Sequence, residues 1–253
     1  MGEALPLELV LTPAEADYSA LDAAVDLLID QCMTARGYEY EPYPPRPPRH
    51  LLDLRVRYGY LTADEAATAG YRSTIPSGEP PQYLAEVEKI DRDRDAEGPD
   101  YLEALFGPNG DGGCRADAST EIWGGPTGLS SVPGYEDLIQ LTVQARDLLQ
   151  SDPDVASVDR SWSICMADRG YHFDSWIDAP VPFLLPGSDV STAEIEQATV
   201  DAECRESVGL EPVLFATETR IQTELIAESP LVDGFSEQIS AAIARAKKTG
   251  PLS

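Results

Sequence analysis

The sequence predicts a mainly α-helical fold, a disulfide-braced helical bundle of two related units with long, irregular loops rich in Pro and Gly. Three observations predict it. Apolar residues recur at helical spacing ahead of two cysteines, a nine-residue pattern beginning with Cys occurs twice, and Pro and Gly cluster between the helical stretches. With 253 residues, 42% of them hydrophobic, the chain is long and apolar enough to bury a core.

The two related units are marked by a repeated motif. Residues 32–40 read CMTARGYEY and residues 165–173 read CMADRGYHF, so Cys, Met, Arg, Gly and Tyr coincide in order. We interpret this repeat as an internal duplication. Each motif is followed by one further cysteine with an arginine beside it, Cys114-Arg115 and Cys204-Arg205. The pattern uses all four cysteines of the chain.

Four cysteines allow three disulfide connectivities. The duplication favours Cys32 with Cys114 and Cys165 with Cys204, because each copy then closes on itself. Such disulfides persist only in an oxidising compartment, which predicts an extracellular or cell-surface location. The alternative is four reduced cysteines within a core. A zinc site fits less well, since no two cysteines form a CxxC pair.

Each leading cysteine is expected near the end of an amphipathic helix and facing the core. The first helix starts at Thr12-Pro13 with Thr12 as its cap and stops at Gly37, and the second has Asp152 as its cap and stops at Gly170. Their expected apolar stripes are Ala14, Tyr18, Leu21, Val25, Leu28 and Cys32 in the first, and Val155, Val158, Trp162 and Cys165 in the second.

Further helices follow from caps and spacing. Ser191 with Glu194 predicts the start of a partner helix that carries Cys204 and ends before Gly209. Other helices are expected at about 62–70, 99–106, 137–149, 212–228 and 231–248, with glycine-rich loops at 107–113 and 124–134.

The predicted organisation is an N-terminal tail (1–11), a first cysteine unit with a long loop insertion (12–134) and a second cysteine unit with the C-terminal helices (135–250). We expect them to form one compact structure. The insertion, about 41–113, begins with EPYPPRPPR, which predicts an extended, polyproline-like strap. Because the insertion occurs in one copy only, we expect the functional surface there.

Net charge excludes two classes of partner. The chain has 45 acidic and 18 basic residues, and its net charge of −27 repels nucleic-acid phosphates and anionic lipid headgroups. No apolar run approaches the roughly 20 residues of a transmembrane segment. The first residues also lack an apolar signal-peptide core, so a location outside the cytoplasm implies a removed N-terminal segment.

The strongest candidate for a metal site is a run of alternating carboxylates that resembles a calcium loop. The calcium-loop spacing fails in both registers, because its twelfth position falls on Leu102 or Ala104. The alternative is a solvated turn of mixed charge, and we expect no cofactor. The calcium candidates are Asp91, Asp93, Asp95 and Glu97.

No catalytic constellation stands out. The chain contains no GxSxG elbow, Walker loop or GxGxxG, and its two histidines, His50 and His172, lie in different copies. Aromatic residues in the loops are candidates for a surface that stacks on a glycan or peptide, the alternative being that they cover the loops. These binding candidates are Tyr43, Tyr58, Tyr60 and Trp176.

The order of short motifs resembles a known family. The motifs are Cys32-Met33 with Gly37, Arg57-Tyr58-Gly59, Ala69-Gly70-Tyr71, Gly112-Gly113-Cys114, Trp162-Ser163-x-Cys165-Met166 with Arg169-Gly170-Tyr171, and Ala202-x-Cys204. Over about 20–230 they resemble uncharacterised actinobacterial cell-envelope lipoproteins. Only three of the 18 basic residues are Lys, which is typical of high-GC genomes such as those of actinobacteria. The resemblance implies export and a lipid anchor on a removed N-terminal segment.

These observations favour an extracytoplasmic, non-enzymatic protein that binds or scaffolds an envelope protein, a peptide or a cell-wall glycan. Long loops on a rigid frame are typical of binding proteins. One alternative is a cell-wall hydrolase, which requires two carboxyl groups converging in a cleft. Another is a secreted signalling or immunity protein.

Overall fold

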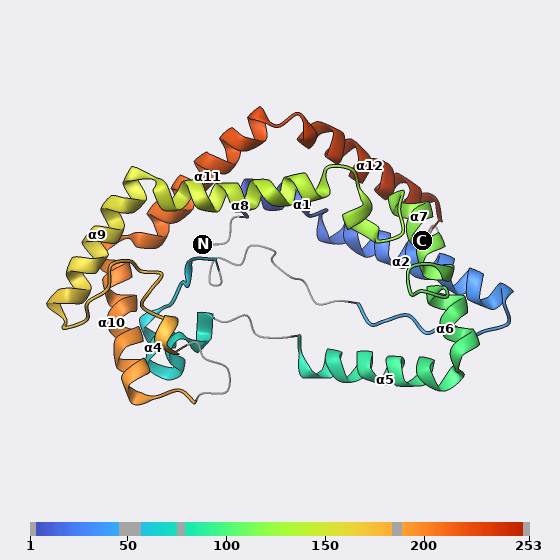
Figure 1. The fold of residues 1–253 in the computed structure, drawn as a ribbon, viewed down its shortest axis with the longest axis horizontal. Coiled ribbons are helices and arrows are strands. Elements are labelled where there is room, and N and C mark those ends of the chain that lie inside the picture. The colour runs from blue at the N-terminus through green and yellow to red at the C-terminus, as the bar shows by residue number, and fades with distance from the viewer. Residues whose placement is uncertain (1–3, 46–56, 75–78, 184–188, 250–253) are drawn as a thin grey trace. The chain divides into compact units, whose positions relative to one another are not determined.

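The computed structural model describes residues 4–45, 57–74, 79–183 and 189–249, and all the regular structure in these residues is helical (Figure 1). The predicted mainly α class is confirmed. In chain order the helices are α1 (Pro6–Leu11), α2 (Glu15–Ala35), α4 (Ala63–Ala69), η1 (Gly70–Thr74), α5 (Pro81–Glu97), α6 (Pro99–Phe106), α7 (Gly113–Trp123), η2 (Gly128–Ser131), α8 (Tyr135–Ser151), α9 (Pro153–Asp168), η3 (Val181–Phe183), α10 (Thr192–Val208), α11 (Leu210–Glu228) and α12 (Leu231–Thr249), where η denotes a 3₁₀ helix.

The chain forms two compact units, each assembled from three separate segments. Unit 1 consists of Met1–Glu8, His50–Ser77 and Leu141–Glu228. Unit 2 consists of Leu9–Arg49, Gly78–Gln140 and Ser229–Ser253. The insertion expected in the first copy is thereby divided, because its residues 50–77 belong with the second cysteine motif. The C-terminal helix α12 belongs with the first motif.

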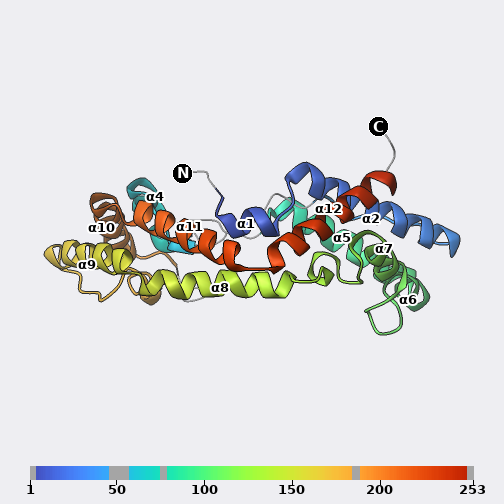
Figure 2. The ribbon, with the colours of Figure 1, turned by 90° about the horizontal axis from the view of Figure 1, so that it is seen from above.

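Unit 2 is built around α2, which packs against α7 and α12, while α6 packs against α7. Figures 1 and 2 show α2 and α12 side by side. The core of unit 2 includes Ile29 and Met33 of α2 and Leu105 of α6. The Cys32–Cys114 disulfide joins α2 to α7, with the two Cα atoms 5.6 Å apart.

Unit 1 is built around α10, which packs against α9, α11, α4 and η1. Its core includes Tyr58, Trp162 on α9 and Leu214 on α11, all buried. The Cys165–Cys204 disulfide joins α9 to α10, with the two Cα atoms 5.7 Å apart.

Both disulfides have the predicted pairing, so that prediction is confirmed. Each disulfide lies within one unit. The cysteines are 82 and 39 residues apart, for which the chain-entropy model gives about 4 kcal/mol of stabilisation per disulfide. Each unit therefore has its own covalent brace.

The first Cys-Met-x-x-Arg-Gly-Tyr motif forms a Schellman cap at the end of α2. The Tyr38 amide donates to the Met33 carbonyl at 3.0 Å, and the Gly37 amide donates to the Thr34 carbonyl at 2.9 Å. This 6→1 and 5→2 pair of hydrogen bonds satisfies the last helix carbonyls. It requires a left-handed residue, which Gly37 supplies with φ of 87°.

The second motif forms the same cap at the end of α9. The Tyr171 amide donates to the Met166 carbonyl at 2.9 Å, and the Gly170 amide donates to the Ala167 carbonyl at 3.0 Å. Gly170 is again left-handed, with φ of 91°. Three positions of the motif, Met, Gly and Tyr, are thus explained by helix capping, and Cys by the disulfide.

Leu21, Val155, Val158 and Trp162 are buried as predicted, but at the cysteines the core-facing position is shifted by one residue. Met33 and Met166 have no exposed surface, whereas the preceding Cys32 and Cys165 are partly exposed. Each disulfide therefore runs from the edge of a helix to a fully buried cysteine on the partner helix, Cys114 or Cys204.

The predicted helix starts are partly correct. The side chains of Asp152 and Ser191 cap α9 and α10 as predicted. The Thr12 cap is wrong: α2 begins at Glu15 with Ala14 as its N-cap residue, because Thr12 directly follows α1. The expected N-terminal tail likewise contains α1. The expected helices at 62–70, 99–106, 137–149, 212–228 and 231–248 correspond to α4, α6, α8, α11 and α12.

The carboxylate run at residues 91–97 is helical, which corrects the expectation of a calcium loop or a turn. These residues form the last two turns of α5. Successive helical side chains are rotated by about 100°, so Asp93 cannot share a face with Asp91 and Asp95. Asp91 accepts a hydrogen bond from Tyr43, and Asp93 pairs with Lys89 at 2.8 Å. In the predicted strap, residues 41–45 are not helical, and 46–49 lie outside the described residues.

Replacing the cap glycines tests the role of the repeated motif. Gly37→Ala and Gly170→Ala should each lower the free energy of unfolding by about 1 kcal/mol, since alanine is strained at positive φ. A Cβ added at either glycine would have no neighbouring atom within 4 Å, so crowding does not contribute. Gly234→Ala, inside α12 at ordinary φ, is the matched control and should stabilise by about 0.5 kcal/mol. Equal effects of all three substitutions in urea unfolding would contradict this explanation.

Candidate functional site

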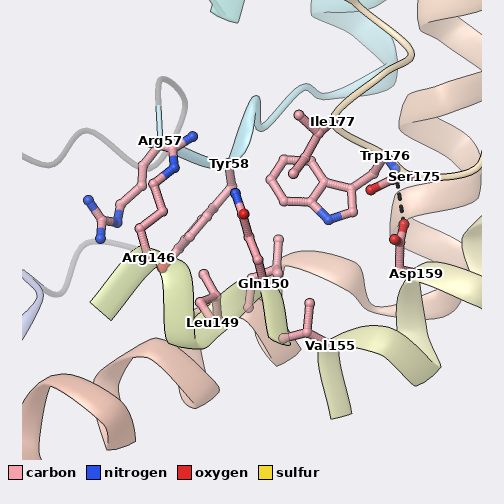
Figure 3. A pocket seen from close by; sticks show the side chains of 11 residues that line it. Arg57, Tyr58, Arg146, Leu149, Gln150, Val155, Asp159, Ser175, Trp176 and Ile177 are labelled. Atoms are coloured by element: carbon pink, nitrogen blue, oxygen red, sulfur yellow. Dashed lines mark hydrogen bonds between the residues drawn. The ribbon is translucent and has the colours of Figure 1, made fainter. Parts of the chain in front are cut away.

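Unit 1 contains a cavity of about 320 Å³ (Figure 3). This volume lies at the lower end of the range of small-molecule sites, about 300–1,000 Å³. The lining residues come from four places: the segment before α4, the end of α8 with the start of α9, the loop after α9, and α11. They are Arg57, Tyr58, Arg146, Leu149, Gln150, Val155, Asp159, Ser175, Trp176, Ile177 and Leu214.

The lining combines apolar, aromatic and charged side chains. Leu149, Val155 and Leu214 are buried apolar residues, and the aromatic side chains of Tyr58 and Trp176 are buried beside them. Figure 3 shows the two arginines toward one end of the cavity and Trp176 with Asp159 toward the other. Such a site offers contact with a flat apolar molecule and polar groups at its ends.

Arg205, on α10, fixes both aromatic residues through their backbones. Its Nη1 donates to the Tyr58 carbonyl at 3.0 Å, and its Nη2 donates to the Trp176 carbonyl at 3.4 Å. The guanidinium carbon also lies 5.3 Å from the centroid of the Trp176 ring. Two segments far apart in the chain are thus attached to one side chain.

The charge of Arg205 is compensated inside the unit. Its side chain is 2% exposed, and it pairs with Asp201 at 2.7 Å and Glu211 at 3.3 Å. Burial by itself lowers the pKa of Arg205, but Asp201 and Glu211 outweigh it and raise that pKa above its ordinary value. Asp201 also accepts a hydrogen bond from the Trp162 indole at 2.8 Å. Arg205 therefore remains charged.

A second buried carboxylate, Glu218 on α11, holds Arg57 and Tyr58. Arg57 Nε donates to Glu218 at 2.7 Å, and the Tyr58 hydroxyl also donates to it. Gln222 donates to Glu218 at 2.9 Å. Burial raises the pKa of Tyr58 to about 12, so its hydroxyl stays protonated as a donor.

Two more buried polar residues of α10 fix neighbouring segments. Glu194 accepts a hydrogen bond from the Tyr71 amide at 3.2 Å, and a Cβ at Gly70 would lie 2.7 Å from the Glu194 carboxylate. Gln197 donates to the Ala179 carbonyl at 2.8 Å, in the loop that carries Trp176. Glu194, Gln197, Asp201 and Arg205 thus form one polar row along the buried face of α10.

The structure brings together only part of the predicted binding set. Tyr58 and Trp176 line the same cavity, whereas Tyr60 does not line it. Tyr43 belongs to unit 2. The centroid of its ring lies 4.1 Å from the guanidinium carbon of Arg94, and its hydroxyl donates a hydrogen bond to Asp91. Of the insertion, where the functional surface is expected, only Arg57 and Tyr58 line this cavity.

Sequence reasoning missed the two arginines and the polar row. Glu194 was expected only as part of a capping box, and Arg146 lies in a helix with no motif. The row could have been recognised from its spacing, because Glu194, Gln197, Asp201 and Arg205 follow one another at intervals of three and four residues. In a chain with 45 acidic residues, however, that spacing also describes a solvated helix face.

Unit 2 has a more open hollow of about 550 Å³ that is lined in part by the carboxylates of Asp100, Glu103 and Asp117. All three residues are exposed. The general acid of a glycosidase instead keeps its proton near neutral pH in apolar surroundings. The hollow therefore gives the hydrolase alternative no specific support.

The described part of the chain contains no group of three or more His, Cys, Asp or Glu side chains placed to hold a metal ion. Among the described residues, every helix is too short or too polar to cross a lipid bilayer. The chain matches no protein-family model, and neither curated proteins nor solved structures give a significant match.

Arg205→Lys tests the network that fixes the cavity. Lysine keeps the charge but cannot reach two carboxylates and two carbonyls from one ammonium group, so the free energy of unfolding should fall by about 3 kcal/mol. Arg115→Lys is the matched control, because Arg115 follows Cys114 as Arg205 follows Cys204 but is exposed. It should change stability by less than about 0.5 kcal/mol. Equal effects in urea unfolding would show that the network adds no stability.

Proposed function

We propose that the protein is an extracytoplasmic, non-enzymatic binding protein of the cell envelope, and that its ligand site is the cavity of unit 1. The observation that carries the proposal is the attachment of Tyr58 and Trp176 to buried Arg205. A cavity whose walls are fixed before the ligand arrives loses little conformational entropy on binding. A chain selected only for stability gains little from buried charges, since apolar residues often stabilise as well.

Two disulfides that use all four cysteines support the extracytoplasmic location. The proposed anchor is a lipid on a removed N-terminal segment, by analogy with the actinobacterial envelope lipoproteins that the motifs resemble. The same disulfide and Schellman cap in both units support an internal duplication. In this proposal the repeated motif maintains the fold, and the ligand binds to residues outside it.

The compartment is tested on protein isolated from its own cells. Intact mass after alkylation without reductant should show no modified cysteine, and reduction should expose all four. Four thiols that react without reductant would contradict the extracytoplasmic assignment. Reduction in the test tube provides the control for complete alkylation.

Blocking the cavity tests the binding site. Gln150 lines the cavity from the exposed face of α8, so Gln150→Trp should fill its mouth without disturbing the core. Native mass spectrometry of protein isolated from its own cells should show a small molecule on the wild type and none on this variant. Gln144→Trp, on the same helix but outside the lining, should retain the molecule. A ligand-free wild type, or equal ligand on both variants, would contradict the proposed site.

A further inference from the structure

The arginine at the mouth of the cavity indicates what the ligand carries. Arg146 lies on α8 with Leu149 and Gln150, at spacings that put all three on one helix face, and it lines the cavity with them. Arg146 is exposed, and no carboxylate among the described residues forms an ion pair with it. In a chain of net charge −27, a cation that lines a cavity and has no ion-pair partner in the described part of the chain is unusual.

The other arginine of the cavity is already neutralised. Arg57 pairs with Glu218, whose side chain has no exposed surface. Burial lowers the pKa of Arg57, and the positive charge of Arg146 lowers it further. Both arginines lie toward the same end of the cavity (Figure 3), but only Arg57 has a carboxylate partner among the described residues. An anionic group of a ligand beside Arg146 would supply the missing counter-charge and accept a charge-assisted hydrogen bond.

The remaining lining favours a flat, apolar body with a single negative charge. Tyr58, Trp176 and Leu149 line the cavity with the small part of each aromatic or apolar side chain that the core leaves uncovered. The carboxylate of Asp159 lies toward the end of the cavity opposite the arginines. Its Oδ1 accepts a hydrogen bond from the Trp176 amide at 3.0 Å. A second negative charge on the ligand would approach this carboxylate and be repelled.

We infer that the cavity of unit 1 binds small organic monoanions, such as carboxylates, that have a flat apolar body. The anionic group binds Arg146, and the body lies against Tyr58 and Trp176. This inference rests on the proposed function, because it assigns a ligand class to the same site. Arg146 acts as the specificity-determining residue, whereas Arg57 belongs to the wall.

Three compounds that share a naphthalene body test the inference by isothermal titration calorimetry on the oxidised full chain. They are 1-naphthaleneacetate, the neutral 1-naphthaleneacetamide and the cationic 1-naphthylmethylammonium. The acetate should bind about tenfold more tightly than the amide, as expected for one hydrogen bond to a charged group. The ammonium compound should bind most weakly.

Two variants separate the charge of Arg146 from the charge of the unit. Arg146→Gln should remove the tenfold preference for the acetate over the amide while leaving the urea midpoint unchanged. Arg160→Gln, exposed on α9 and outside the lining, is the matched control and should keep the preference. A preference that survives Arg146→Gln would overturn the inference.

The outcomes also separate this inference from the proposed function. Equal binding of acetate and amide to the wild type would overturn the anion preference while leaving a functional cavity in place. Failure of all three compounds to bind would overturn the assigned ligand class. The proposed function itself is contradicted only if Gln150→Trp retains the ligand, if the wild type carries no ligand, or if the four thiols react without reductant.

Discussion

The buried charge of Arg205 is the constraint on which unit 1 depends. A guanidinium group without water must find partners for its donors and a counter-charge, and here Asp201, Glu211 and two backbone carbonyls from distant segments supply them. Because two of those partners are backbone atoms, satisfying the charge also determines where the Tyr58 and Trp176 segments lie. The cavity between α8, α9 and these segments follows from that arrangement.

The two units show how one local design supports different outcomes. Both have a helix that ends in a Schellman cap, a disulfide to a buried cysteine and an arginine directly after that cysteine. In unit 1 this arginine is Arg205, which is buried among carboxylates. In unit 2 it is Arg115, which is exposed and lies 5.8 Å from the centroid of the Phe106 ring. The cavity with its two aromatic residues therefore depends on the buried arginine, since the Cys-Met-x-x-Arg-Gly-Tyr motif alone is present in both units.

Much of the frame was predictable from sequence because it depends on local rules. The disulfide pairing followed from the repeat, and the starts of α9 and α10 followed from Asp152 and Ser191. The candidate site was only half predictable. Tyr58 and Trp176 could be named as exposed-loop aromatics, but their convergence depends on hydrogen bonds between residues more than 25 positions apart.

Helix α5 and the polar row of α10 show why other predictions failed. The carboxylates of α5 fit either a loop or a solvated helix, and charge pattern alone does not separate them. On α10, the tertiary contacts of Arg205 turn a polar face inward, against the rule that polar faces lie outward. Pattern rules fail here because some of the partners of the buried Arg205, the Tyr58 and Trp176 carbonyls, lie in distant segments.

Amide hydrogen exchange at Trp176 tests the central claim most directly. This amide lies in a loop and donates to Asp159, while its carbonyl accepts from Arg205. If the network fixes the loop, the Trp176 amide exchanges as slowly as the core amides of α9 and α10 and only through unfolding of unit 1. Rapid exchange of Trp176 while those helices remain protected would contradict the account.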